Sequence, residues 1–143
     1  MKVGPVDLSP REIALTGMKA QRTRMNVVAN NIANAFTTRM PDGEPFRRQI
    51  PIFRGEQVLP RADTSRFGVR VPRVEADGIS PLRTVYEPGH PDANEDGYVT
   101  YPNVDLAVEM VNLLAAQRAY EANIAVVQSG GQMHQRALEI LQT

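Results

Sequence analysis

Apolar residues recur with helical spacing in two long stretches, one towards each end of the chain. The first stretch follows Ser9 and Pro10, residue types that favour the N-cap and the first position of a helix. It predicts a helix over residues 9–35, about 40 Å long at the standard rise per residue. The apolar positions on one face of this helix are Met18, Met25, Val28 and Ile32.

The second stretch starts near Asn103 and predicts a helix that runs to residue 141. Its apolar residues alternate in steps of four and three over five heptads, which is the spacing of a coiled-coil seam. Gly130 and Gly131 mark a point where this helix can bend or fray. The predicted seam positions are Leu106, Met110, Leu113, Gln117, Tyr120, Ile124, Val127, Gly131, His134, Leu138 and Leu141.

The segment between the two helices is rich in proline and contains short β-prone runs. Nine of the eleven prolines lie between Pro41 and Pro102, and proline is strongly disfavoured in helix interiors. We therefore divide the chain into an N-terminal helix in residues 1–36, a central extended segment in residues 37–102 and a C-terminal helix in residues 103–143. The expected strands cover residues 46–53, 66–74, 82–86 and 97–101.

The expected fold is therefore mainly α. The long N- and C-terminal helices are expected to pair in a coiled-coil-like manner, with short β-strands in the proline-rich centre. Pro51 and Pro72 confine their strands to sheet edges or bulges, so we expect no large sheet with a deep core of its own.

Charge is missing from long parts of both helices. Residues 25–38 and 122–135 contain no Asp, Glu, Lys or Arg, although a solvated helix of that length normally carries several on its exposed face. Asn30, Asn31 and Asn34 fall in the first of these parts, and buried amides can bond across helices and fix their register. Such faces suit a crowded protein interface, so we expect a lattice subunit. The alternative is a monomeric bundle with an amide-rich surface.

The candidate subunit-interface residues combine the apolar positions of both helices with these amides. They are Met18, Met25, Val28, Asn30, Asn31, Ile32, Asn34, Leu106, Met110, Leu113, Tyr120, Ile124, Val127 and Leu138.

The net charge is zero but is unevenly distributed along the chain. Residues 1–60 carry a balance of +4, residues 61–86 of +2 and residues 87–143 of −6, so the two ends attract each other within one molecule or between copies. The absence of cysteine excludes disulfides and thiolate metal sites. Acidic residues dilute the basic ones and no aromatic platform accompanies them, so we expect no nucleic-acid partner.

Membrane and secretory segments are not expected. No run approaches the roughly 18 consecutive apolar residues of a membrane span, and the first fifteen residues lack the apolar core of a secretory signal. We therefore expect no direct membrane insertion and no cleaved signal peptide.

Two short motifs invite chemical interpretations. The segment DANEDG (92–97) matches the first half of an EF-hand calcium loop, but the twelfth position is Asn103 in place of the bidentate glutamate, and a turn before a strand is the better interpretation. His90 has no marked nucleophile to serve, such as a G-x-S-x-G serine. We predict no catalytic, cofactor-binding or metal-binding residue. A small hydrolase or calcium-regulated protein is the alternative that would use these motifs.

Three segments together are similar to a known family. They are GMKAQRTRMNVVANNIANAFTT (17–38), VYEPGHPDANEDGYVTYPNVD (85–105) and EMVNLLAAQRAYEANI (109–124). They resemble the bacterial flagellar rod, hook and hook-filament family, and the last two resemble its proximal rod members in particular. The chain departs from the family pattern at Phe36, where another asparagine is common, and at Gly130 and Gly131.

The resemblance implies a structural subunit of the proximal rod, the drive shaft of the flagellar basal body. In that family the terminal helices pair and line the inner tube, the middle segment faces outward, and subunits polymerise helically to transmit torque. The implied location is the rod in the periplasmic space, reached through the flagellar type III export apparatus. The implied partners are the rod proteins FlgB, FlgF and FlgG, the basal-body protein FliE and further copies of the chain. The alternative is a monomeric helical-hairpin adaptor or export chaperone.

Overall fold

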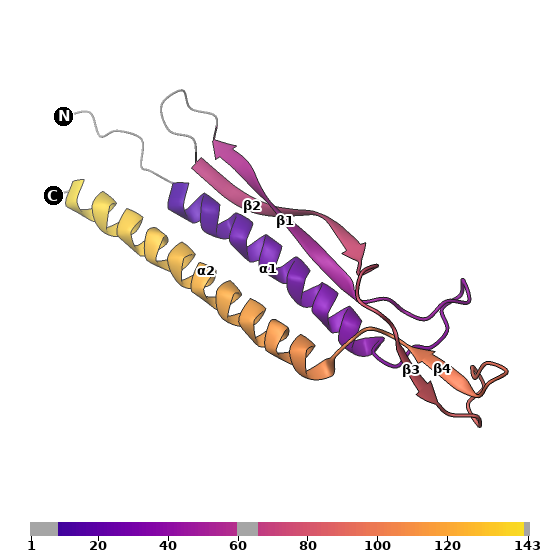
Figure 1. Ribbon diagram of the computed structural model, residues 1–143. Coiled ribbons are helices and arrows are strands. Elements are labelled where there is room, and N and C mark those ends of the chain that lie inside the picture. Colours follow the sequence, from indigo (N-terminus) through magenta and orange to yellow (C-terminus); the bar gives the residue numbers. More distant parts are fainter. Residues whose placement is uncertain (1–8, 60–65, 142–143) are drawn as a thin grey trace. The chain divides into compact units, whose positions relative to one another are not determined.

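The structure is a computed structural model that describes residues 9–59 and 66–141. The chain forms two compact units, and each unit gathers segments from the start, the middle and the end of the sequence. Unit 1 consists of Met1–Thr23, Phe53–Pro72 and Ala116–Thr143, and unit 2 of Arg24–Ile52 and Arg73–Ala115. The elements, in order, are α1 (Ser9–Ala33), β1 (Gln49–Leu59), β2 (Arg66–Ala76), β3 (Arg83–Tyr86), β4 (Tyr98–Tyr101) and α2 (Leu106–Leu141) (Figure 1).

In unit 1, the first half of α1 packs closely against the second half of α2. A Cβ atom placed on Gly17 would lie 2.8 Å from Oδ1 of Asn123 and 3.0 Å from its Cγ, so glycine is what allows this approach. The amide of Asn123 donates a 2.8 Å hydrogen bond to the carbonyl oxygen of Ala119. On α1, the hydroxyl of Thr16 accepts a 3.0 Å bond from the backbone N–H of Val69 in β2. Unit 1 is therefore held by contacts of small and polar side chains.

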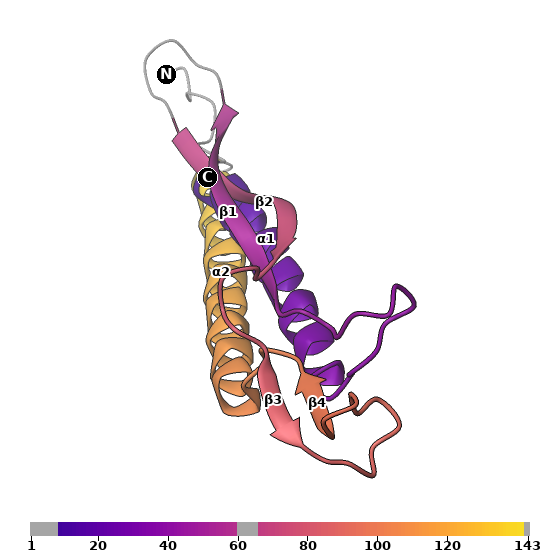
Figure 2. The ribbon, with the colours of Figure 1, turned by 45° about the vertical axis from the view of Figure 1, so that its right-hand side comes forward.

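In unit 2, the last ten residues of α1 face the first turns of α2, and β3 pairs with β4 in antiparallel register (Figure 2). Val85 lies opposite Val99 in this register, and Val99 is fully buried. Tyr86 and Tyr98 stack edge to face with ring centroids 5.2 Å apart, a favourable aromatic geometry. The turn that closes the hairpin needs a left-handed residue, which Gly97 supplies with φ of 82°.

The expectation of a mainly helical, coiled-coil-like fold is wrong. Two 11-residue strands, β1 and β2, form one two-stranded sheet, and the shorter β3 and β4 form a second. The predicted seam of α2 includes Met110 and Gln117, but both are exposed, whereas Glu109 and Ala116 are fully buried. A coiled coil requires apolar side chains to interlock at these positions. Of the described residues of α2, the fully buried ones carry a carboxylate and a methyl group, which do not form such an apolar seam.

The element boundaries follow the sequence pattern more closely than the packing does. α1 begins at Ser9 as predicted and ends two residues earlier than expected, while α2 begins at Leu106 and continues as one helix through Gly130 and Gly131. The carboxylate of Asp105 accepts the backbone N–H groups of residues 107 and 108 at 2.8 and 3.2 Å, which makes it the N-cap. β1 extends well beyond the run 46–53.

Both prolines in the long strands lie in edge strands, as the sequence predicted. Pro51 lies in β1 and Pro72 in β2, and in a two-stranded sheet each strand has an unpaired edge where a missing N–H costs nothing. Neither helix, over the residues that the structure describes, contains an apolar stretch long enough to cross a membrane.

Gly17 and Gly131 provide a matched test of the close approach in unit 1. Replacing glycine with alanine inside a helix gains about 1 kcal/mol of intrinsic propensity, and a Cβ on Gly131 meets open space. We expect Gly131→Ala to raise the free energy of unfolding by up to about 1 kcal/mol. We expect Gly17→Ala to lower it by about 1 kcal/mol, because Asn123 must move and lose its bond.

Urea denaturation followed by circular dichroism measures both changes. The double variant Gly17→Ala, Asn123→Ala should recover part of the loss, since the smaller side chain makes room. An equal gain from alanine at Gly17 and at Gly131 would show that no close approach exists.

Candidate functional site

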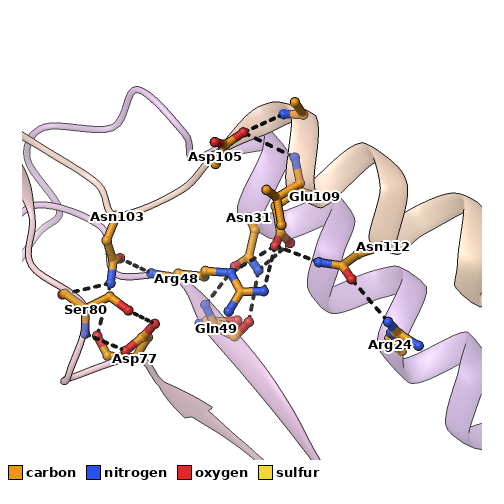
Figure 3. Close-up of polar contacts among 12 residues, drawn as sticks. Arg24, Asn31, Arg48, Gln49, Asp77, Ser80, Asn103, Asp105, Glu109 and Asn112 are labelled. Carbon is orange, nitrogen blue, oxygen red and sulfur yellow. Dashed lines mark hydrogen bonds and ion pairs between the residues drawn. The ribbon is translucent and has the colours of Figure 1, made fainter.

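A buried amide connects three elements of unit 2. Asn31 in α1 has no exposed surface. Its Nδ2 donates to the carbonyl oxygen of Gln49 in β1 and to Oε2 of Glu109 in α2, both at 2.9 Å, and its Oδ1 accepts the backbone N–H of Gln49 at 2.8 Å (Figure 3). The Asn31 amide thus exchanges two hydrogen bonds with the backbone of Gln49, as a neighbouring strand would, and donates a third to Glu109 in α2. One side chain thereby sets where β1 begins relative to α1 and α2.

The carboxylate of Glu109 is the charged centre of this network. It is fully buried, and its Oε1 accepts bonds from Arg48 Nε at 2.9 Å and Nη2 at 2.8 Å. Asn112 donates a longer bond of 3.3 Å to the same oxygen, and its own Oδ1 accepts a bond from Arg24 at 3.2 Å. Arg48 keeps 26% of its side chain exposed. A buried charge is tolerated when it is paired and hydrogen-bonded in this way.

A hydrogen-bonded turn adjoins the network through Asn103. Its Oδ1 accepts the backbone N–H of Arg48 at 2.8 Å, and its Nδ2 donates to the carbonyl oxygens of Asp77 and Ser80, both at 3.2 Å. The carboxylate of Asp77 accepts the N–H groups of Ile79 and Ser80 and the hydroxyl of Ser80. These bonds, led by the Ser80 backbone N–H, hold the pKa of Asp77 below its usual 3.8. The charged form therefore stabilises the turn above pH 3.8 and loses that effect as the pH falls through the lowered pKa.

An open hollow of about 480 Å³ lies beside the N-terminus of α2. Its walls mix apolar side chains such as Phe36 and Leu106 with Arg83 and Asp105. Asp105 is already engaged as the N-cap of α2. The hollow therefore presents no arranged pair of groups suited to acid–base or nucleophilic chemistry.

The structure places the three asparagines of α1 in different roles. Asn31 is the buried connector described above, whereas Asn30 is exposed and Asn34 is half-buried. Asn34 Nδ2 donates to the carbonyl oxygen and to Oδ1 of Asn30, at 3.0 and 2.9 Å, and the hydroxyl of Thr37 donates to Asn34 Oδ1. Asn30 and Asn34 thus satisfy backbone and side-chain groups where α1 ends.

The other candidate interface residues differ in burial. Val28 is buried inside the chain, while Met110 and Leu138 are exposed by 53% and 46%. His134 and Leu141, also on the predicted seam, have side chains outside the described part. The half-buried candidates are Met18, Met25, Ile32, Leu106, Leu113, Tyr120, Ile124 and Val127. Their role as subunit contacts stays a prediction.

Sequence reasoning missed two features of α2. The first is the buried Glu109. The sequence signal that could have indicated it is its position as the single charged residue in an otherwise uncharged run of the helix. The second is the exposed apolar face formed by Val108, Val111 and Leu114, which are exposed by 51%, 66% and 57%. The heptad pattern assigned the apolar positions to the helix seam, so these outward residues were not singled out.

The half EF-hand segment is occupied by contacts within unit 2. Asp92 pairs with Arg39 at 2.8 Å and accepts the hydroxyl of Thr38 at 2.7 Å. Asn94 Oδ1 accepts the backbone N–H of Tyr98, and His90 Nδ1 accepts that of Asp92. Among the described residues no three His, Asp or Glu side chains gather as a metal site. These contacts agree with a turn that leads into β4.

Asn31 and its neighbour Asn30 allow a matched test of the buried network. Asn31→Asp keeps the shape but removes both donated bonds and places a second carboxylate beside Glu109. We expect it to lower the free energy of unfolding by about 3 kcal/mol. Asn30→Asp keeps its accepting oxygens at an exposed position, so we expect a change within about 0.5 kcal/mol. Chemical denaturation at pH 7 measures both, and equal effects would rule out the buried connector.

Comparison with known proteins identifies the family of the chain. The family model described as "Flagella basal body rod protein" matches residues 12–39, and the one described as "Flagellar basal body rod FlgEFG protein C-terminal" matches residues 95–140. The relative named flagellar basal-body rod protein FlgC in Borreliella burgdorferi is 45% identical, over 91% of this chain and 94% of the relative. The relative of the same name in Salmonella typhimurium is 40% identical, over 90% of this chain and 93% of the relative. A third, in Bacillus subtilis, is 38% identical over 90% and 93%. The chain belongs to the FlgC family of flagellar basal-body rod proteins.

Proposed function

We propose that this protein is a structural subunit of the rod of the bacterial flagellar basal body, with no catalytic role. The observation that carries the proposal is the near full-length similarity to basal-body rod proteins. The site geometry agrees with it, because the buried polar groups of unit 2 are used to join elements of the chain. A part that transmits force needs such fixed internal geometry more than it needs a reactive group.

The exposed face of α2 supports assembly with other molecules. From residue 107 to residue 117 the only ionisable side chain is Glu109, which points inward and is fully buried. Val111 and Leu114 lie on the exposed side. A contiguous apolar, uncharged helix surface is typical of a protein–protein contact. We therefore assign this face, together with the exposed candidate residues of the helices, to contacts with neighbouring subunits.

From the resemblance of the sequence, we further propose that the subunit lies in the proximal rod, polymerises helically and transmits torque as part of the drive shaft. Its terminal helices belong to the inner tube and residues 37–102 face outward. Its partners are then FlgB, FlgF, FlgG, FliE and further copies of this chain, and it reaches the periplasmic space through the type III export apparatus.

A monomeric helical-hairpin adaptor or export chaperone is the competing function. It requires a chain that remains in the cytoplasm and does not enter the basal body. Purified basal bodies therefore separate the two functions directly, since a chaperone is absent from them and a rod subunit is retained.

Val111→Asp tests the assembly role without disturbing the buried network. The side chain is 66% exposed, so we expect the isolated variant to unfold within about 0.5 kcal/mol of the wild type. We expect at least a tenfold loss of the chain from purified basal bodies and a loss of swimming, because a carboxylate would have to be buried in the contact. Thr84→Asp, at an exposed position of β3, is the control and should incorporate normally. A wild-type chain missing from basal bodies would refute the proposed function.

A further inference from the structure

The two compact units carry opposite charge. Unit 1 contains ten Lys and Arg against six Asp and Glu, and unit 2 contains six against ten. Unit 1 therefore carries a net charge of +4 and unit 2 of −4, and each unit gathers segments that are far apart in the sequence. The chain as a whole is neutral, so its surface has two regions of opposite sign. Such regions orient molecules as they approach one another.

Three of the ten Lys and Arg residues of unit 1 lie on the exposed side of α1. Arg11, Lys19 and Arg22 fall on one face by helical spacing, and all three are exposed. No carboxylate of the described residues forms an ion pair with any of them. We call these three residues the basic stripe. It extends about 16 Å along the helix, which is enough to contact more than one partner side chain.

Four of the ten Asp and Glu residues of unit 2 lie in two turns. One turn holds Asp42 and Glu44, and the other holds Glu95 and Asp96. The bonds of Asp92 to Thr38 and Arg39 attach the second turn to the segment that leads into the first. All four acidic side chains belong to exposed residues, and none pairs with a cation among the residues described. We call them the acidic turns.

We infer that the basic stripe of one copy docks on the acidic turns of a second copy. The inference rests on the proposed function, since it requires that copies of the chain meet in the rod. It adds to that function a named contact and the identity of the partner.

The physical reason lies in which pairings the charges permit. A contact between two stripes, or between two sets of acidic turns, would bring like charges together. A stripe that meets the acidic turns of another copy pairs opposite charges instead. Each exposed pair contributes only about 0.2–1 kcal/mol. The charges therefore select orientation, while apolar surface such as Val111 supplies affinity.

Charge reversal with rescue tests the contact in full-length chains expressed in motile cells. The first variant is Arg11→Glu, Arg22→Glu, the second is Asp42→Lys, Glu44→Lys, and the third combines all four changes. We expect each of the first two to lower incorporation into basal bodies at least tenfold, because like charges then face each other. We expect the combined variant to regain at least half of the wild-type level, since the pairing is restored with signs exchanged.

A control matches the change in net charge away from the stripe. Arg54 and Arg70 are exposed residues of the same unit, so Arg54→Glu, Arg70→Glu should incorporate like the wild type. Thermal unfolding of each purified variant within a few degrees of the wild type verifies that the fold is intact. Recovery in the combined variant supports the inference. A combined variant that stays defective, reversals without effect, or a control that loses as much would overturn it, even when the wild-type chain is found in basal bodies.

Discussion

The buried carboxylate of Glu109 is the constraint on which the arrangement of unit 2 depends. A charge without exposed surface costs several kcal/mol unless it is paired and hydrogen-bonded. Its partners, Asn31 and Arg48, come from α1 and from the residue just before β1. All three segments must therefore be present at once for the charge to be accommodated. The same requirement explains why Asn31, a mediocre helix former, occupies an interior position of α1.

The first turns of α2 bury a carboxylate and expose apolar side chains. A solvated helix buries its apolar face, yet here Glu109 and Ala116 are buried while Val111 and Leu114 are exposed. The polar interior favours one register within unit 2, because Asn31 and Glu109 find their partners only when α1, β1 and α2 are correctly aligned. The apolar exterior remains for a neighbour. This division of roles agrees with a subunit whose fold is completed by assembly into a rod.

Charge acts at two distances in the same molecule. At short range, Glu109 and Arg48 lie within 3 Å and fix the position of a strand. At longer range, the exposed charges of unit 1 and unit 2 differ in sign and bear on how copies approach. The first effect is shielded from salt by burial, whereas the second is screened over about 8 Å at physiological ionic strength. Stability and assembly therefore respond differently to solution conditions.

The sequence by itself determined the local elements and the family. Proline placement, the Ser9 start and the apolar spacing located both helices and four strands, because these signals act between residues close in the chain. Heptad spacing placed the seam at Met110 and Gln117, and it failed because spacing cannot tell which face of a helix meets a polar partner. Only the tertiary structure decided that Glu109 and Asn123 face inward. Their partners, Arg48 and Gly17, lie far away in sequence, and no local pattern records a hydrogen bond or a close approach between segments that folding alone brings together.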